Sequence, residues 1–222
     1  MLNQETTYAY EIADRLTLVN QGNQTRAFKY DAGGQLLFER ISEMAATIND
    51  GTGTMWSAKF TYTDWGAGAT KQDARGVITT YGYDSLHRMT SVAYNTSGAS
   101  GVAATATVTF NYDNVNGSET KGLLLSIAVT GSYSESYAYD SNKRVSSVTR
   151  TMDGRNYSTS FQYNTANQQT QMTYPSGRVI NFGHDNKGRL TSAGSFLSSV
   201  TYNGIGQLTG TTLGNGVTES YG

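Results

Sequence analysis

The chain contains two histidines, His87 and His184, whose side chains are the best suited of all to acid–base chemistry near neutral pH. A histidine that acts as a general base needs a nucleophile within hydrogen-bond reach, and the sequence has neither a cysteine nor a Gly-x-Ser-x-Gly motif. Two histidines are also too few for most imidazole-based metal sites. Both are therefore predicted to be structural, and the sequence assigns no catalytic residue, metal ligand or cofactor-binding residue.

Aspartates are the second possible source of chemistry, since two carboxylates held together can act as acid and base. Five aspartates each follow a ring-bearing residue: Asp31, Asp84, Asp113, Asp140 and Asp185. A short acidic side chain at the start of a turn can accept hydrogen bonds from backbone amides two residues further on. Their spacing places one aspartate in each turn, so all five are predicted to cap turns.

These aspartates belong to a repeat that runs through the chain. It reads aromatic, any residue, tyrosine, acid or amide, two variable residues, a turn former, arginine or glutamine, and an aliphatic residue. The second aromatic position, which we call the anchor, is occupied by Tyr10, Tyr30, Tyr62, Tyr83, Tyr112, Tyr139, Tyr163, His184 and Tyr202. Successive anchors lie 18 to 32 residues apart, as expected for one unit with surface insertions.

Arginine or glutamine falls five residues after the anchor in the seven complete copies; the copies at Tyr62 and Tyr112 keep only the first half of the pattern. The arginines at this position are Arg15, Arg88, Arg144 and Arg189. Their side chains are predicted to stack on aromatic rings or to pair with acids of a neighbouring hairpin.

The repeat predicts a β-hairpin. Residues two apart point to the same face of a strand, and the glycine or asparagine found four residues after several anchors indicates a positive φ in the turn. The fold class is therefore predicted as all-β, a curled antiparallel sheet of about nine consecutive hairpins. Loop insertions are expected near residues 41–59 and 95–108, and residues 39–46 are the one stretch that could form a helical turn.

The array is expected to be a single domain over residues 1–222 and a segment of a longer array, because Glu219-Ser220-Tyr221 resembles the start of a further copy. Its first and last strands, at residues 6–10 and 216–221, carry little charge and no proline. Such edges can pair with another strand. The predicted partners are the remainder of the longer chain or copies of this chain.

Composition excludes several classes. The net charge of −1 gives no electrostatic attraction to nucleic acids. No apolar stretch reaches the length of a membrane span, and the first seven residues lack the basic and apolar parts of a signal peptide. The segment 113–119 has the wrong ligand spacing for a calcium-binding EF-hand loop. The glycine pairs at 51–53 and 66–68 lack the third glycine of a dinucleotide motif, so no cofactor is expected.

The segment Tyr174–Thr191 closely resembles the YD repeat, also called the Rhs repeat, with His184 in place of the usual tyrosine. In that family, long repeat arrays form a β-sheet strip that coils into a hollow shell. Bacterial members enclose a toxic polypeptide, and the related teneurins of animals carry a shell outside the cell. The resemblance implies a non-enzymatic structural module of a secreted or surface-exposed bacterial protein. The single proline, Pro175, lies in an ordinary repeat turn, so the Pro- and Asp-containing self-cleavage signature of bacterial shells is missing.

A carbohydrate-recognition module is the alternative from another class. Tyrosines and tryptophans in rows on an open sheet can form a platform for sugar rings. Trp56 and Trp65 lie outside the repeat pattern and are the predicted glycan contacts.

Overall fold

The computed structural model describes residues 5–113 and 121–222. These residues form strands and turns and no helix, which confirms the all-β class. Nineteen strands belong to an antiparallel sheet in which neighbours along the chain pair with each other, and β5 and β6 form a separate two-stranded ribbon. Within the described ranges there is no helix long and apolar enough to cross a membrane.

The chain divides into two compact units, Met1–Phe110 with Val129–Gly131 and Asn111–Ala128 with Ser132–Gly222. The strands of unit 1 are β1 (Thr6–Tyr10), β2 (Leu16–Gln21), β3 (Gln24–Tyr30), β4 (Leu36–Ile41), β5 (Ile48–Asn49), β6 (Met55–Trp56), β7 (Ala58–Tyr62), β8 (Gly68–Asp73), β9 (Ile78–Tyr83) and β10 (Met89–Asn95). The boundary falls in β11 (Val108–Tyr112). The strands that follow are β12 (Leu124–Val129), β13 (Tyr133–Tyr139), β14 (Val145–Met152), β15 (Arg155–Tyr163), β16 (Gln169–Thr173), β17 (Val179–His184), β18 (Leu190–Ala193), β19 (Leu197–Tyr202), β20 (Leu208–Leu213) and β21 (Thr218–Ser220). The single array over residues 1–222 stays a prediction.

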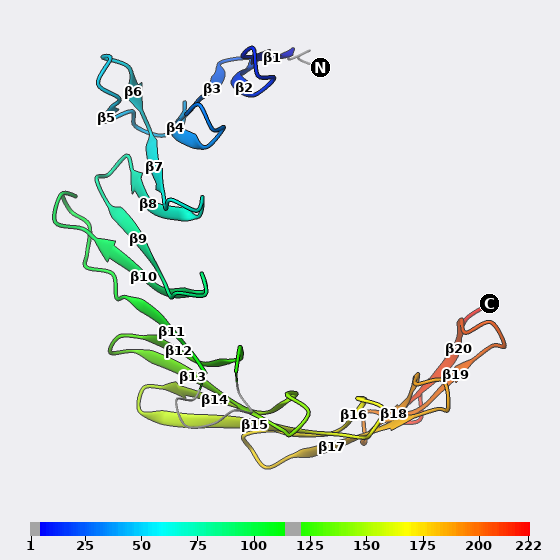
Figure 1. The fold of residues 1–222 in the computed structure, drawn as a ribbon. Coiled ribbons are helices and arrows are strands. Elements are labelled where there is room, and N and C mark those ends of the chain that lie inside the picture. The colour runs from blue at the N-terminus through cyan, green and yellow to red at the C-terminus, as the bar shows by residue number, and fades with distance from the viewer. Residues whose placement is uncertain (1–4, 114–120) are drawn as a thin grey trace. The chain divides into compact units, whose positions relative to one another are not determined.

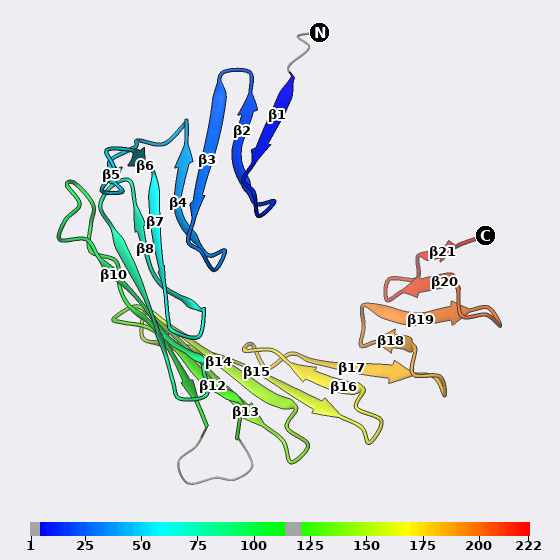
Figure 2. The same ribbon diagram turned by 45° about the horizontal axis from the view of Figure 1, so that its top comes forward.

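Both units are built from hairpins (Figures 1 and 2). Every anchor is the last residue of its strand. In most repeats the strand register shifts at the anchor. In the β13–β14 pair, for example, Ala138 lies opposite Ser147 and Tyr139 lies opposite Val145. Each shift has the form of a β-bulge, with the extra residue, such as Ser146, on the strand that follows the turn.

The turns after all anchors except Tyr112, whose turn lies outside the described residues, follow one design, as the repeat predicts. In the turn after Tyr139, the Lys143 amide donates to the Asp140 carbonyl oxygen and the Asp140 amide donates to the Arg144 carbonyl oxygen, both at 2.9 Å. The residue four positions after the anchor has a positive φ whether it is a glycine, as at Gly34, or not, as at Lys143. A left-handed residue at this position closes the loop and starts the bulge.

The first insertion is a folded element and not the loop expected from the sequence. Residues 48–56 form the β5–β6 ribbon beside β4 and β7 (Figures 1 and 2), and Ile48 and Trp56 pack with Phe38 as the most buried apolar cluster of unit 1. The Asp50 side chain, 2% exposed, pairs with the Lys29 ammonium at 2.6 Å. The Lys29 ammonium, then the Thr52 hydroxyl and amide, hold the pKa of Asp50 far below its usual range.

The possible helical turn at residues 39–46 does not form. Glu39, Arg40 and Ile41 complete β4, and the Met44 amide donates to the Ile41 carbonyl oxygen in a tight turn. Backbone bonds to the adjacent strands, such as that from the Ser57 amide to the Glu39 carbonyl oxygen, hold this stretch extended.

The second insertion, near residues 95–108, follows β10 as a loop. Asn95 ends β10, and its side-chain oxygen accepts hydrogen bonds from the amide and the hydroxyl of Ser97. The Gly98 carbonyl oxygen then lies 2.8 Å from where a Cβ on Gly76 would stand. Gly76, with a φ of 89°, is therefore needed both for its own turn and for the close approach of this loop.

Candidate functional site

The recurring polar side chains meet at the junctions between hairpins, at the end of each hairpin that carries the anchor turn. We name a junction by its two anchors. At the 139–163 junction, the β14–β15 ladder ends at the pair Ser147–Ser160. The two strands part beyond this pair, which leaves carbonyl groups without a ladder partner, and the Tyr163 hydroxyl donates to the Val145 carbonyl oxygen at 2.9 Å.

The same bond recurs in both units and always joins an anchor hydroxyl to a carbonyl of the preceding hairpin. It is made by Tyr30 to Leu16, Tyr62 to Leu36, Tyr83 to Gly68, Tyr139 to Leu124, Tyr163 to Val145 and Tyr202 to Leu190, at 2.6–3.0 Å. Burial raises the pKa of Tyr62 and of Tyr139 above the usual tyrosine value, so these hydroxyls remain protonated donors at neutral pH.

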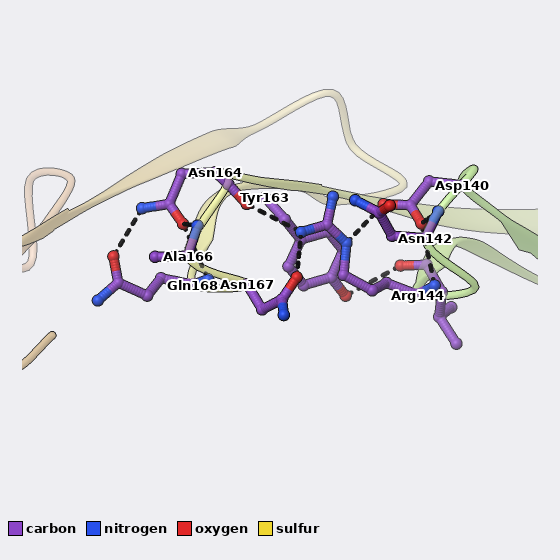
Figure 3. A network of polar contacts seen from close by, with 9 residues as sticks. Asp140, Asn142, Arg144, Tyr163, Asn164, Ala166, Asn167 and Gln168 are labelled. Atoms are coloured by element: carbon purple, nitrogen blue, oxygen red, sulfur yellow. Dashed lines mark hydrogen bonds and ion pairs between the residues drawn. The ribbon is translucent and has the colours of Figure 1, made fainter.

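Arginine makes the reciprocal contact, from the earlier hairpin to the later one. Arg144 pairs through its Nε with Asp140 Oδ2 at 2.7 Å, and its Nη1 donates to the Asn164 carbonyl oxygen and to Asn167 Oδ1, each at 2.9 Å (Figure 3). Its guanidinium also lies 4.7 Å from the centre of the Tyr163 ring. We call the pair of a stacked arginine and a hydroxyl-bonded tyrosine a full connector.

Full connectors recur at the 10–30 and 184–202 junctions. Arg15 pairs with Glu11, donates to the Asp31 carbonyl oxygen at 2.9 Å and lies over the Tyr30 ring. Arg189 pairs with Asp185 at 2.6 Å and lies 4.4 Å from the centre of the Tyr202 ring. Arg88 pairs in the same way with Asp84.

The acid that pairs with each arginine belongs to its own turn, four residues earlier. The sequence predicted pairing with acids of a neighbouring hairpin, and this is wrong. The turn brings residues i and i+4 together, because the amide of Asp140 and the carbonyl of Arg144 are already bonded to each other. The predicted stacking on aromatic rings is correct, and the ring is the anchor of the next hairpin.

The turn aspartates cap their turns through hydrogen bonds from backbone amides. Asp140 Oδ1 accepts from the amides of Asn142 and Arg144 at 2.9 and 3.0 Å (Figure 3). Burial alone would raise the pKa of Asp140, but the Arg144 amide and guanidinium and the Asn142 amide together lower it below its usual range.

The Arg88 amide and the Arg189 amide are the main causes of the lowered pKa of Asp84 and of Asp185, respectively. Asp31 Oδ1 accepts from the Gln35 amide at 2.8 Å, and Asp113 Oδ1 accepts from the Gly122 amide.

The 62–83 junction is held differently. Ala67 stands where other repeats have arginine, and Trp65 from the turn after Tyr62 lies with its edge against the Tyr83 ring at 5.0 Å and stacks flat on the His87 ring at 4.0 Å. His87 is the left-handed residue of its turn, with a φ of 63°. The turn after Tyr62 is complete, so Trp65 belongs to the repeat and does not lie outside it as expected.

The 163–184 junction has neither half of a full connector. Gln168 replaces arginine and its Oε1 accepts from Asn164 Nδ2 at 2.6 Å within its own turn (Figure 3). His184 replaces the anchor tyrosine and has no hydroxyl. An apolar hollow of about 220 Å³ lies here, lined by Gln169, Met172, Phe182, His184 and Leu190.

The other predicted site residues are placed as follows. Tyr10 ends β1 and is exposed, and Tyr112 ends β11. Most of the segment 113–119, considered as a calcium loop, lies outside the described residues. Among the described residues there is no group of three or more histidine, aspartate and glutamate side chains that could hold a metal ion.

The predicted glycan contact at Trp56 is wrong as an exposed site, because its ring is 6% exposed in the cluster with Phe38. The insertion folds back on β4 and buries it. Trp65 is 43% exposed, so the carbohydrate alternative rests on this residue, one face of which is already covered by His87.

A sheet of hairpins joined by recurring tyrosine and arginine contacts defines a repeat protein. Residues 120–194 match the family model described as teneurin YD-shell. No curated protein matches the chain.

Solved structures share the fold. A crystal structure titled TcdB2-TccC3-TEV superposes with a TM-score of 0.64 at 16% identity, over 95% of this chain and 12% of that one. A structure of the Photorhabdus luminescens Tc holotoxin pore, with the mutation TccC3-D651A, gives a TM-score of 0.62 at 16% identity, over 94% of this chain and 12% of that one. The chain thus spans about an eighth of the length of these structures. The match to the teneurin YD-shell model over residues 120–194, together with the repeat, supports the YD-repeat, or Rhs-repeat, family.

Proposed function

We propose that this chain is a non-enzymatic structural segment of a secreted or surface-exposed bacterial YD-repeat protein, in which it forms part of a shell, scaffold or fibre. The observation that carries the proposal is the use of the recurring side chains. Aspartate, arginine and tyrosine of the repeat bond to each other and to backbone groups across the junctions. Their hydrogen-bonding capacity therefore holds one hairpin to the next.

The partners follow from the end strands. β1 pairs with β2, and β21 pairs with β20. The second edge of each of these end strands is therefore open to a further strand. An unpaired edge is a template for a further strand. The remainder of a longer array, or another copy of this chain, is proposed to add there. Light scattering of the isolated chain over a concentration series tests self-association, and a mass that stays monomeric at every concentration would exclude it.

The structural role is tested in the full-length protein that contains this chain. The double variant Arg144→Ala/Tyr163→Phe removes one full connector, together with the ion pair between Arg144 and Asp140. Arg155→Ala is the matched control, because Arg155 is an exposed arginine of the neighbouring strand. A structural segment predicts faster proteolysis within the array, and faster release or digestion of any enclosed polypeptide, in the double variant only. Unchanged protease resistance together with loss of a chemical activity would show the proposal to be wrong.

A further inference from the structure

Asparagine followed by glycine is a sequence prone to spontaneous deamidation, because glycine has no side chain to hinder the attack of its own backbone nitrogen on the asparagine side chain. The pair occurs at Asn116, Asn203 and Asn215. Asn116 lies outside the described residues. The other two lie in turns of unit 2, where their surroundings can be compared directly.

The two turns differ in the nitrogen that would attack. At Asn215, the Gly216 amide donates to the Leu213 carbonyl oxygen at 2.9 Å and is held in its turn. At Asn203, the Gly204 amide is exposed, and no group among the described residues accepts a hydrogen bond from it. The space around Gly204 is open, since an added Cβ would meet nothing within 4 Å. The nitrogen beside Asn203 is therefore free to move onto the side chain.

The side-chain carbonyl of Asn203 is also polarised for such an attack. Its Oδ1 accepts hydrogen bonds from the Ile205 amide at 3.2 Å and from the Gln207 amide at 2.9 Å. Backbone amides in this arrangement stabilise the negative charge that develops on a carbonyl oxygen when a nucleophile adds. Asn215 Oδ1 accepts one such bond, from the Val217 amide at 3.1 Å. The turn at Asn203 thus has both the free nitrogen and the more strongly polarised carbonyl.

Asn164 isolates the contribution of the glycine. It caps the equivalent turn, and its Oδ1 accepts from two turn amides at 2.9 and 3.0 Å. Its Nδ2 donates to Gln168 Oε1, as Asn203 Nδ2 does to the glutamine of its own turn. The next residue is Thr165, whose branched side chain crowds the backbone nitrogen. The asparagine contacts of the two turns match, and the residue that supplies the attacking nitrogen does not.

We propose that Asn203 is a site of spontaneous deamidation in the folded chain. The Gly204 nitrogen forms a bond to Cγ of Asn203, the Cγ–Nδ2 bond breaks, and Nδ2 leaves as ammonia with the proton of the Gly204 amide. Water then opens the cyclic imide. Opening at Cγ leaves an aspartate, the residue that Asp140 and Asp185 supply in equivalent turns. Opening at the main-chain carbonyl leaves an isoaspartate, which lengthens the turn backbone by a methylene group. The site does not depend on the proposed structural role.

The test is peptide mapping by mass spectrometry, applied to the folded full chain after incubation in oxygen-18 water at mildly alkaline pH. Asn203 should acquire the label and the mass of an amide-to-acid conversion about fivefold faster than Asn215, because reaction at Asn215 must first break the bond from Gly216 to Leu213. Asn164 should remain unconverted over the same period. In urea, where the turns are lost, Asn203 and Asn215 should convert at similar rates.

Gly204→Ala is the matched variant, since its methyl group has room in the fold and crowds the attacking nitrogen. It should suppress conversion at Asn203 and leave Asn215 unchanged, and thermal unfolding confirms that the variant folds. Equal rates at Asn203 and Asn215 in the folded chain would overturn the proposal. So would a rate difference that persists in urea, which would assign it to the neighbouring sequence, or undiminished conversion at Asn203 in Gly204→Ala.

Discussion

The 139–163 and 163–184 junctions are neighbours in unit 2 and share the β15–β16 hairpin, yet they are held by different forces. The first has a stacked arginine, an ion pair and a tyrosine hydroxyl on a backbone carbonyl. The second has a glutamine bonded within its own turn and a histidine anchor beside a hollow. The turns themselves are nearly identical in both. The hairpin is thus encoded separately from the contact that joins it to the next hairpin.

The largest difference between the junctions should appear when the residue five positions after the first anchor of each, Arg144 or Gln168, is replaced by alanine. Arg144→Ala loses the bonds to Asn164 and Asn167 and the stack on Tyr163, and should lower the free energy of unfolding by about 2 kcal/mol. Gln168→Ala loses the hydrogen bond from Asn164 and the approach of Gln168 Nε2 to the turn at Gly188, but no stacked ring, and should cost about 0.5 kcal/mol. Urea denaturation measures both. Equal losses would mean that the arginine contributes nothing across the junction.

The tyrosine hydroxyl can be removed alone. Tyr163→Phe leaves the ring under Arg144 and deletes the donor to Val145, which should cost about 1 kcal/mol because a carbonyl between parted strands loses its partner. Thermal unfolding measures the loss. The matched change Tyr157→Phe alters a tyrosine of the same strand that is 40% exposed and should have little effect. A neutral Tyr163→Phe would show that water satisfies Val145 equally well.

The opposite change should repair the weaker junction. His184→Tyr supplies a hydroxyl that can donate to the Gln169 carbonyl oxygen, and it should raise the free energy of unfolding by up to about 1 kcal/mol. The reverse substitution, Tyr163→His, should destabilise the neighbouring junction. If His184→Tyr is destabilising, the backbone at this junction differs from the others in a way that excludes the phenol.

The smallest expected effect is a local response to acid. Asp140 and Asn164 hold equivalent turn amides, at 2.9–3.0 Å, but only Asp140 titrates. Its pKa is lowered on folding, so its contribution is complete above the usual aspartate value near 4 and is lost as the pH falls from there through the lower folded value. Hydrogen-exchange protection of the Arg144 amide should therefore fall in acid more than that of the Gln168 amide. Equal loss at both amides would contradict the capping role of the charge.

The turns could be predicted from the sequence because their chemistry is local. An acid or amide after the anchor, and a residue with a positive φ three positions later, lie within one five-residue segment, as at Asp140 and Lys143. The predicted positive φ holds even where the residue is Asp14 or His87, neither of which has the freedom of glycine. The spacing of these residues in the sequence is therefore enough to predict such a turn.

Stacking of the arginines on aromatic rings could be predicted, but the hydroxyl bonds across the junctions could not, because their partners lie far apart in the chain. The bond from Tyr163 to Val145 spans 18 residues, and that from Tyr62 to Leu36 spans 26. Because every residue has a backbone carbonyl, the residue type does not indicate which carbonyl accepts the bond. The prediction of an exposed position for Trp56 is wrong for the same reason. The pattern of the insertion does not reveal that Ile48 and Trp56 fold back onto Phe38, which belongs to β4.

The parting of the strands beyond each ladder has a consequence for how this chain can change in length. At the end of each hairpin that carries the anchor turn, a residue added or removed would shift the anchor away from the carbonyl it must reach. At the other end, connections range from the tight turn at Gly154 to the insertions near residues 41–59 and 95–108. Duplication and the grafting of foreign sequence are therefore expected to succeed at that second end, and whole hairpins, not single residues, are the unit in which such an array can grow.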